Sequence, residues 1–205
     1  MQTGGITPKQ VAIDAFISVL EDARVAVSLG FGSAMSASRE ASRASAALYK
    51  AASGRDLLDA GATVAEHVAA EIDVDRWRQY ITVHSAVALE GSLVVFNSVD
   101  LALKHYARTR YGASDRRWII GGPSYGTTPR TLFEIVRAVC NYFRHRDEWL
   151  VGQGLQRASR SSSILTDLGI NPTAANAHLA VFAMLPFTTW LDFESAIVGA
   201  IGGLQ

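Results

Sequence analysis

The chain has 205 residues, of which 49% are apolar, and its 19 basic side chains balance its 19 acidic ones. This composition argues against disorder, which combines low hydrophobicity with high net charge. Zero net charge also argues against attraction of the whole surface to nucleic acid or anionic lipid. A single cysteine excludes an intrachain disulfide, and nothing in the sequence requires an oxidising compartment.

The two most apolar stretches, residues 86–103 and 177–201, are both interrupted by acidic side chains. A membrane-spanning helix needs about 20 predominantly apolar residues, and centrally placed acids cost a few kcal/mol each. Buried core helices therefore explain both stretches better. The first residues show no secretory signal, because they are neither basic nor followed directly by an apolar run. We expect a cytoplasmic location and no membrane partner.

The N-terminal third carries clear helix signals. Thr7 and Pro8 predict a helix start, apolar residues at three-and-four spacing continue it, and Gly30 and Gly32 are expected to end it. Residues 33–53 and 55–72 then predict two further helices, the first of them rich in alanine and serine. Because large apolar residues are nearly absent from residues 33–53, that helix is expected to pack closely or weakly. Residues 33–72 are expected to form a peripheral or mobile appendage.

The longest predicted helix covers residues 75–111, and Gly91 marks either a kink in it or a close crossing with another helix. A glycine-rich loop follows, and Thr128 with Pro129 predicts the start of a helix that reaches about Trp149. The remaining predicted helices cover residues 164–168, 172–185 and 188–201. The pattern predicts an all-α fold, an irregular bundle of about six to eight helices that forms a single domain over residues 1–205.

One polar stripe on the predicted helix 129–149 carries the strongest functional signal. On a helical wheel the large apolar residues gather on one side, and the opposite side is predicted to point away from the core. Neighbouring members of the stripe are three or four positions apart, so their side chains stack. The stripe consists of Glu134, Arg137, Asn141, His145 and Glu148, and Arg144 flanks it.

This set of side chains suits cleavage of a phosphodiester. Histidine is the side chain whose unperturbed pKa lies nearest neutrality, so the imidazole of His145 can give and take protons. Asn141, one turn earlier, can orient the imidazole or a substrate. Arg144 or Arg137 can bind phosphate or stabilise developing negative charge. A plain solvated helix face, whose last-turn cations offset the helix dipole, explains the same stripe without any chemistry.

The segment Asn141-x-x-x-His145, near the end of a bundle helix, resembles the motif of the HEPN superfamily. The resemblance implies a small helical protein, and many such proteins are metal-independent RNases of toxin–antitoxin, phage-defence and RNA-processing systems. Asn141 matches the polar position of the motif and His145 the catalytic histidine, whereas Cys140 stands where the family has arginine. The resemblance also implies a homodimer whose two motif faces form one composite cleft.

Two hypotheses follow. In the first, the protein is a HEPN-like homodimer that binds or cleaves RNA or a nucleotide, with His145, Asn141 and Arg144 as candidate catalytic residues and Arg137 and Glu148 as candidate substrate-binding residues. In the second, it is a non-enzymatic helical module that binds a partner protein through the polar stripe. We expect no cofactor, and the scattered histidines show no metal-ligand spacing.

Overall fold

The structure, a computed structural model, describes residues 7–58, 61–112, 124–126, 128–151, 159–174 and 176–203. These residues form six helices and no strand; an isolated antiparallel bridge joins Ser124 to Thr131. The helices are α1 (Pro8–Asp56), α2 (Val64–Tyr111), α3 (Leu132–Leu150), α4 (Ser159–Asp167), α5 (Ala177–Met184) and α6 (Trp190–Gly202). The all-α prediction is thereby confirmed.

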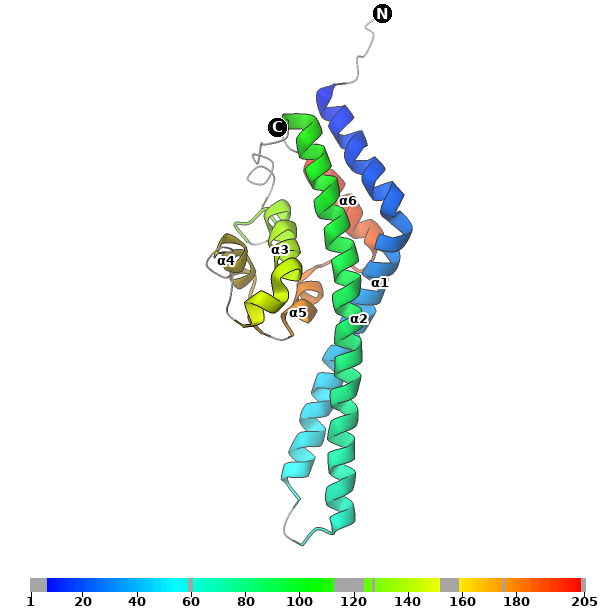
Figure 1. The fold of residues 1–205 in the computed structure, drawn as a ribbon, viewed down its shortest axis with the longest axis vertical. Helices are drawn as coiled ribbons and strands as arrows, with labels where there is room; N and C mark the ends of the chain where they lie inside the picture. Colours follow the sequence, from blue (N-terminus) through cyan, green and yellow to red (C-terminus); the bar gives the residue numbers. More distant parts are fainter. Residues whose placement is uncertain are drawn as a thin grey trace, which may run out of the picture.

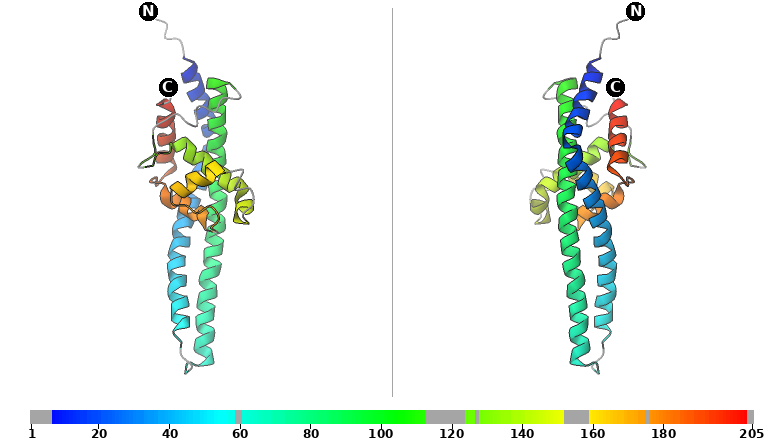
Figure 2. Two further views of the ribbon diagram at one scale, coloured as in Figure 1. Left: turned by 90° about the vertical axis from the view of Figure 1, so that its left-hand side faces the viewer. Right: turned by 90° about the vertical axis from the view of Figure 1, so that its right-hand side faces the viewer.

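Two very long helices dominate the molecule. Helices α1 and α2, of 49 and 48 residues, run antiparallel as a helical hairpin (Figure 1). The four shorter helices gather around one half of the hairpin and lie on one side of it (Figure 2). The other half projects as a two-helix arm that contains most of residues 33–72 (Figure 1).

The predicted helix end at Gly30 and Gly32 is wrong, because α1 continues without a break to Asp56. A glycine costs a helix interior only about 1 kcal/mol relative to alanine. Packing against α2 offsets that cost, because α1 buries a row of small residues along this contact. The row consists of Ala34, Ala37, Ala41 and Ala44.

At Gly91 the structure decides between a kink and a close crossing, in favour of the crossing. A Cβ on Gly91 would lie 2.5 Å from the carbonyl oxygen of Gly30, and one on Gly30 would lie 3.1 Å from that of Gly91. The two backbones therefore approach so closely that Gly91 has no room for a Cβ unless α1 shifts, and a Cβ at Gly30 would be in tight contact with α2. This contact sets how tightly the hairpin closes.

The helix predicted over residues 55–72 is also wrong. Helix α1 ends at Asp56, and α2 begins only at Val64. A capping box defines the new start: the Thr63 side chain accepts from the Glu66 amide, and the Glu66 carboxylate accepts from the Thr63 amide. The sequence carries this signal as threonine followed three residues later by glutamate.

An aromatic cluster forms the centre of the core, where five helices meet. The ring centroids of Phe31 and Phe182 are 5.5 Å apart, those of Phe96 and Phe143 5.7 Å, and those of Phe31 and Phe193 5.8 Å. These rings come from α1, α2, α3, α5 and α6, and all five are buried. Apolar burial of this kind is the main stabilising contribution to the fold.

The later helices are confirmed with shifted bounds. Helix α3 begins at Leu132 after the N-cap Thr131, three residues beyond the predicted cap. Helix α4 is longer than the predicted segment 164–168, because it already begins at Ser159. The predicted loop between residues 113 and 128 lies mostly outside the described residues.

Candidate functional site

Helix α3 positions most of the polar residues considered above. Its N-terminus has a capping box, in which the Thr131 side chain accepts from the Glu134 amide and the Glu134 carboxylate accepts from the Thr131 amide. Its apolar face, which includes Ile135, Val139 and Phe143, is buried in the main core. This burial fixes the rotation of α3 and therefore the direction of its polar side chains.

Glu134 and Asn141 of the stripe do not point away from the bundle, contrary to the prediction, because residues of α4 contact them. Glu134 is buried and accepts a hydrogen bond from Arg160, with 2.9 Å between Nη2 and Oε1. The Asn141 amide donates to the Ser161 hydroxyl across 2.9 Å. These contacts hold α3 against α4, so Asn141 is part of a helix–helix contact.

His145 lies at a break in α3. Its backbone torsions, φ −119° and ψ 17°, are not helical, although the helix resumes and continues to Leu150. After the break, buried Trp149 packs edge-on against Tyr142, with 5.9 Å between ring centroids. The break therefore sits on an anchored segment, which holds the backbone of His145 in place.

The imidazole of His145 is paired with a carboxylate. Its Nδ1 lies 3.4 Å from Oε2 of Glu148, and the two side chains are 49% and 57% exposed. A carboxylate at Nδ1 favours the tautomer with a proton there, which leaves Nε2 as the acceptor. The pair is open to solvent and can meet a ligand from outside.

Arg144 points toward α2. Its Nη2 donates to Oδ2 of Asp100 at 2.7 Å, and Nζ of Lys104 lies 2.6 Å from the same oxygen. The Asp100 side chain is only 3% exposed, whereas those of Arg144 and Lys104 are 38% and 40% exposed. Two cations share one buried carboxylate, so the surface above it keeps an excess of positive charge.

Cys140 lies beside this ion cluster and is not a nucleophile. Its thiol is buried and lies 2.9 Å from the carbonyl oxygen of Phe96, to which it donates. Burial raises the pKa of the Cys140 thiol, with a further contribution from Asp100, while Arg144, Lys104 and Arg137 act in the opposite direction. The thiol therefore stays protonated and inert near neutral pH.

The structure separates the predicted site residues. The Asn141 amide contacts Ser161 of α4, the Arg144 guanidinium contacts Asp100 of α2, and Arg137 contributes to the electrostatics around the Cys140 thiol. His145 and Glu148 pair with each other, and both side chains are open to solvent. Sequence reasoning missed Asp100 and Lys104 as site residues. The signal was an acid inside an apolar helix with a lysine four positions later, since a buried carboxylate needs a partner.

No three His, Cys, Asp or Glu side chains gather as a candidate metal site within the part of the chain that the structure describes.

Of the described helices, α2 alone is long and apolar enough to cross a membrane, with a mean hydropathy of 1.5 in its most apolar window, and half of that window is buried inside the protein. A core helix of a soluble protein passes the same test.

Comparisons with known proteins give no family assignment. No protein-family model matches this chain, and no similar curated protein or solved structure was found. The class that fold and site define is therefore a helical protein with a long hairpin, a paired His145–Glu148 and a cationic cluster between α2 and α3.

Proposed function

We propose that the protein is a HEPN-like RNA-binding protein that cleaves RNA without a metal ion. The observation that supports this function best is the pairing of half-exposed His145 with Glu148 at the break in α3. An imidazole that is oriented by a carboxylate and open to solvent is the arrangement that general acid–base catalysis requires.

The proton-transfer step uses the free nitrogen of His145. Nε2 takes the proton from a ribose 2′-hydroxyl, the 2′-oxygen bonds to phosphorus, and the bond from phosphorus to the 5′-oxygen breaks. The proton returns from the imidazolium to the 5′-oxygen, directly or through a water molecule. The products are a 2′,3′-cyclic phosphate and a 5′-hydroxyl end. Glu148 stabilises the imidazolium that forms in between.

Arg144 is the candidate phosphate-binding residue. It immediately precedes His145 in the chain. Its guanidinium is held by Asp100, and the Arg144 side chain is still 38% exposed. Lys104 adds a second partly exposed cation at the same carboxylate. These charges favour a phosphate group and stabilise the negative charge that develops on it. In this proposal Arg137 contributes to the same cationic surface and Asn141 holds the helix against α4.

The test uses purified full-length protein and end-labelled single-stranded RNA in the presence of EDTA. We expect cleavage that leaves 2′,3′-cyclic phosphate ends, and we expect an oligonucleotide with 2′-deoxyriboses to bind without being cut. His145→Ala should lower the cleavage rate by about 10²-fold or more, the usual contribution of a positioned acid–base group. Glu148→Gln should lower it by a smaller factor.

Exposed His105 on α2 provides the matched control, and His105→Ala should cleave RNA at the wild-type rate. If wild-type protein binds RNA but His145→Ala and wild type are equally inactive, the protein is a binding protein and not a nuclease. Absence of both binding and cleavage would refute the proposal.

A second candidate function is supported by a separate observation. Along α2, a seven-residue repeat of apolar side chains, Tyr80, Val87, Val94 and Leu101, is 40%, 42%, 41% and 58% exposed. This is the spacing with which one helix meets another in a coiled coil. We therefore infer a non-enzymatic role as well, in which this stripe binds an amphipathic helix of a second copy or of a partner protein.

This role is tested by the mass of the protein in solution. Light scattering should give a dimer for wild type and a monomer for Val87→Glu with Val94→Glu. A wild-type monomer that captures no helical peptide would exclude a contact of this kind.

A further inference from the structure

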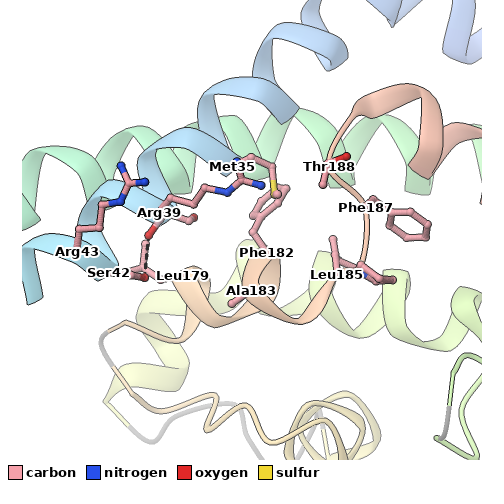
Figure 3. A pocket seen from close by; sticks show the side chains of 12 residues that line it. Met35, Arg39, Ser42, Arg43, Leu179, Phe182, Ala183, Leu185, Phe187 and Thr188 are labelled. Carbon is pink, nitrogen blue, oxygen red and sulfur yellow. Dashed lines mark hydrogen bonds between the residues drawn. The ribbon is translucent and has the colours of Figure 1, made fainter. Parts of the chain in front are cut away.

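A pocket between α1 on one side and α5 with the α5–α6 connection on the other is separate from the site on α3. It has a volume of about 410 Å³ and no lining residue from α3. Its apolar walls are Met35 on one side and Phe182, Leu185 and Phe187 on the other (Figure 3). This volume lies within the range of roughly 300–1,000 Å³ that is typical of small-molecule sites.

The polar groups of the pocket are cationic or neutral. Arg39 and Arg43 both line it, and no acidic side chain does. Arg43 is paired with Glu40 at 2.5 Å. Arg39 forms no ion pair with any residue that the structure describes, and Figure 3 shows its side chain extended along the pocket toward Met35 and Phe182. One guanidinium beside an apolar wall is thus left without a counter-ion.

A second polar group also lacks a partner. Ser38 lines the pocket and is 5% exposed. Its buried hydroxyl has no hydrogen-bond partner among the described residues. Since a buried hydroxyl without a hydrogen bond costs free energy, this is a second feature that a bound ligand or water would relieve.

From these observations we propose that the pocket binds a small amphipathic anion. Its carboxylate or phosphate head group bonds Arg39, and its apolar chain lies between Met35 and the residues that follow α5. The charge of Arg39 selects the anionic head group, because a guanidinium forms strong paired hydrogen bonds with planar or tetrahedral oxyanions. The aromatic and aliphatic wall selects the apolar chain, because its burial removes apolar surface from water.

Calorimetric titration of the full chain tests the proposal with three probes that share an alkyl chain: octanoate, octyl phosphate and octan-1-ol. We expect saturable binding of at least one anion and clearly weaker binding of the neutral alcohol. Whichever of octanoate and octyl phosphate binds more tightly identifies the preferred head group. Arg39→Gln should weaken binding of that anion about tenfold, the equivalent of one charge-assisted hydrogen bond, and leave the alcohol unaffected.

Two variants locate the site. Arg78→Gln removes an exposed arginine of α2 that does not line the pocket, so it should bind the anion as wild type does. Ala183→Trp fills the pocket from an exposed position on α5 and should abolish binding of all three probes. A photoreactive octanoate analogue should also label Met35 or Phe182 in the wild-type chain, a readout that needs no variant.

The proposal would be overturned by no saturable binding of either anion, by equal binding of the anions and the alcohol, or by equal effects of Arg39→Gln and Arg78→Gln. Labelling confined to residues outside the pocket would also overturn it. The RNA assay does not involve these residues, so failure here leaves the proposal for α3 unaffected.

Discussion

Arg144 of α3 donates a hydrogen bond to Asp100 of α2, with 2.7 Å between Nη2 and Oδ2, and joins the candidate site to the central helix of the fold. The carboxylate is almost fully buried, and Lys104 is its second partner. The interaction therefore has a structural role whatever the polar surface of α3 binds. Removing one partner of a buried ion pair leaves the other partner's charge uncompensated, and such substitutions have large effects on stability.

Asp100→Ala should lower the free energy of unfolding by about 1–3 kcal/mol. The loss stays below that of a fully buried pair because the two cations are more than one third exposed and can regain water. Urea unfolding at neutral pH measures it. Asp75→Ala, which breaks an exposed pair with Arg78, should change stability by less than about 0.5 kcal/mol. Equal effects of the two substitutions would show that Asp100 does not hold α2 and α3 together.

Two glycines of the hairpin should respond to alanine in opposite directions. Gly91→Ala places a Cβ 2.5 Å from a carbonyl oxygen of α1, so it should destabilise the protein by about 1–3 kcal/mol. Gly32→Ala meets nothing within 4 Å inside the same long helix pair, and should stabilise the protein by up to about 1 kcal/mol. Thermal unfolding compares them. A neutral Gly91→Ala would mean that the helices do not cross closely there.

The start of α2 should depend on pH. Hydrogen bonds from the Thr63 amide and hydroxyl hold the pKa of Glu66 below its ordinary value of 4.5. Because the folded pKa is depressed, the stabilising contribution is present above 4.5 and is lost as pH falls through the folded pKa. Amide exchange in the first turn of α2, corrected for intrinsic rates, should accelerate over that range. Glu66→Gln should remove this pH dependence, and Thr63→Ala should weaken protection at all pH values.

Thr82→Ala is the control for the cap, since the Thr82 hydroxyl only donates to a carbonyl within α2. It should leave exchange in the first turn unchanged. Identical exchange in wild type and Glu66→Gln across the acidic range would contradict the capping box.

Cys140 should resist thiol reagents in the native protein. Burial raises the pKa of its thiol, so the thiolate is scarce at pH 8 and the sulfur is inaccessible. Ellman's reagent should react fully only after unfolding, whereas an exposed cysteine introduced by Ser36→Cys should react at once. A raised folded pKa also means that this contribution to stability is complete below the unfolded thiol pKa and declines as pH rises above it. Rapid native labelling of Cys140 would place it at the surface.

Much of the local structure was accessible from the sequence. Thr7 with Pro8 predicted the start of α1, and the apolar face of residues 129–149 predicted the buried side of α3. The capping boxes at Thr63 and Thr131 carried equally clear signals, but both were missed: a helix was predicted across the first, and the second helix was predicted to start at Thr128. Local signals of this kind depend only on residues three or four positions apart.

The candidate site could be predicted from the sequence only in part. The spacing placed Asn141 and His145 on one side of a helix, but a helical wheel of one segment does not show the neighbouring helix that covers part of that side. Asn141 donates a hydrogen bond to Ser161, which is 20 residues away in the chain, and Arg144 donates one to Asp100, which is 44 residues away. Such partners cannot be identified from the periodicity of a single segment.

By itself, the sequence determined that this protein is helical and which faces of its helices are apolar, because both follow from propensity and periodicity. Only the tertiary structure decided that Gly30 lies inside a continuous helix, that Gly91 marks a crossing, and that His145 remains open while Asn141 does not. These outcomes depend on free energies of packing between segments distant in the chain, which outweigh the preference of any single residue.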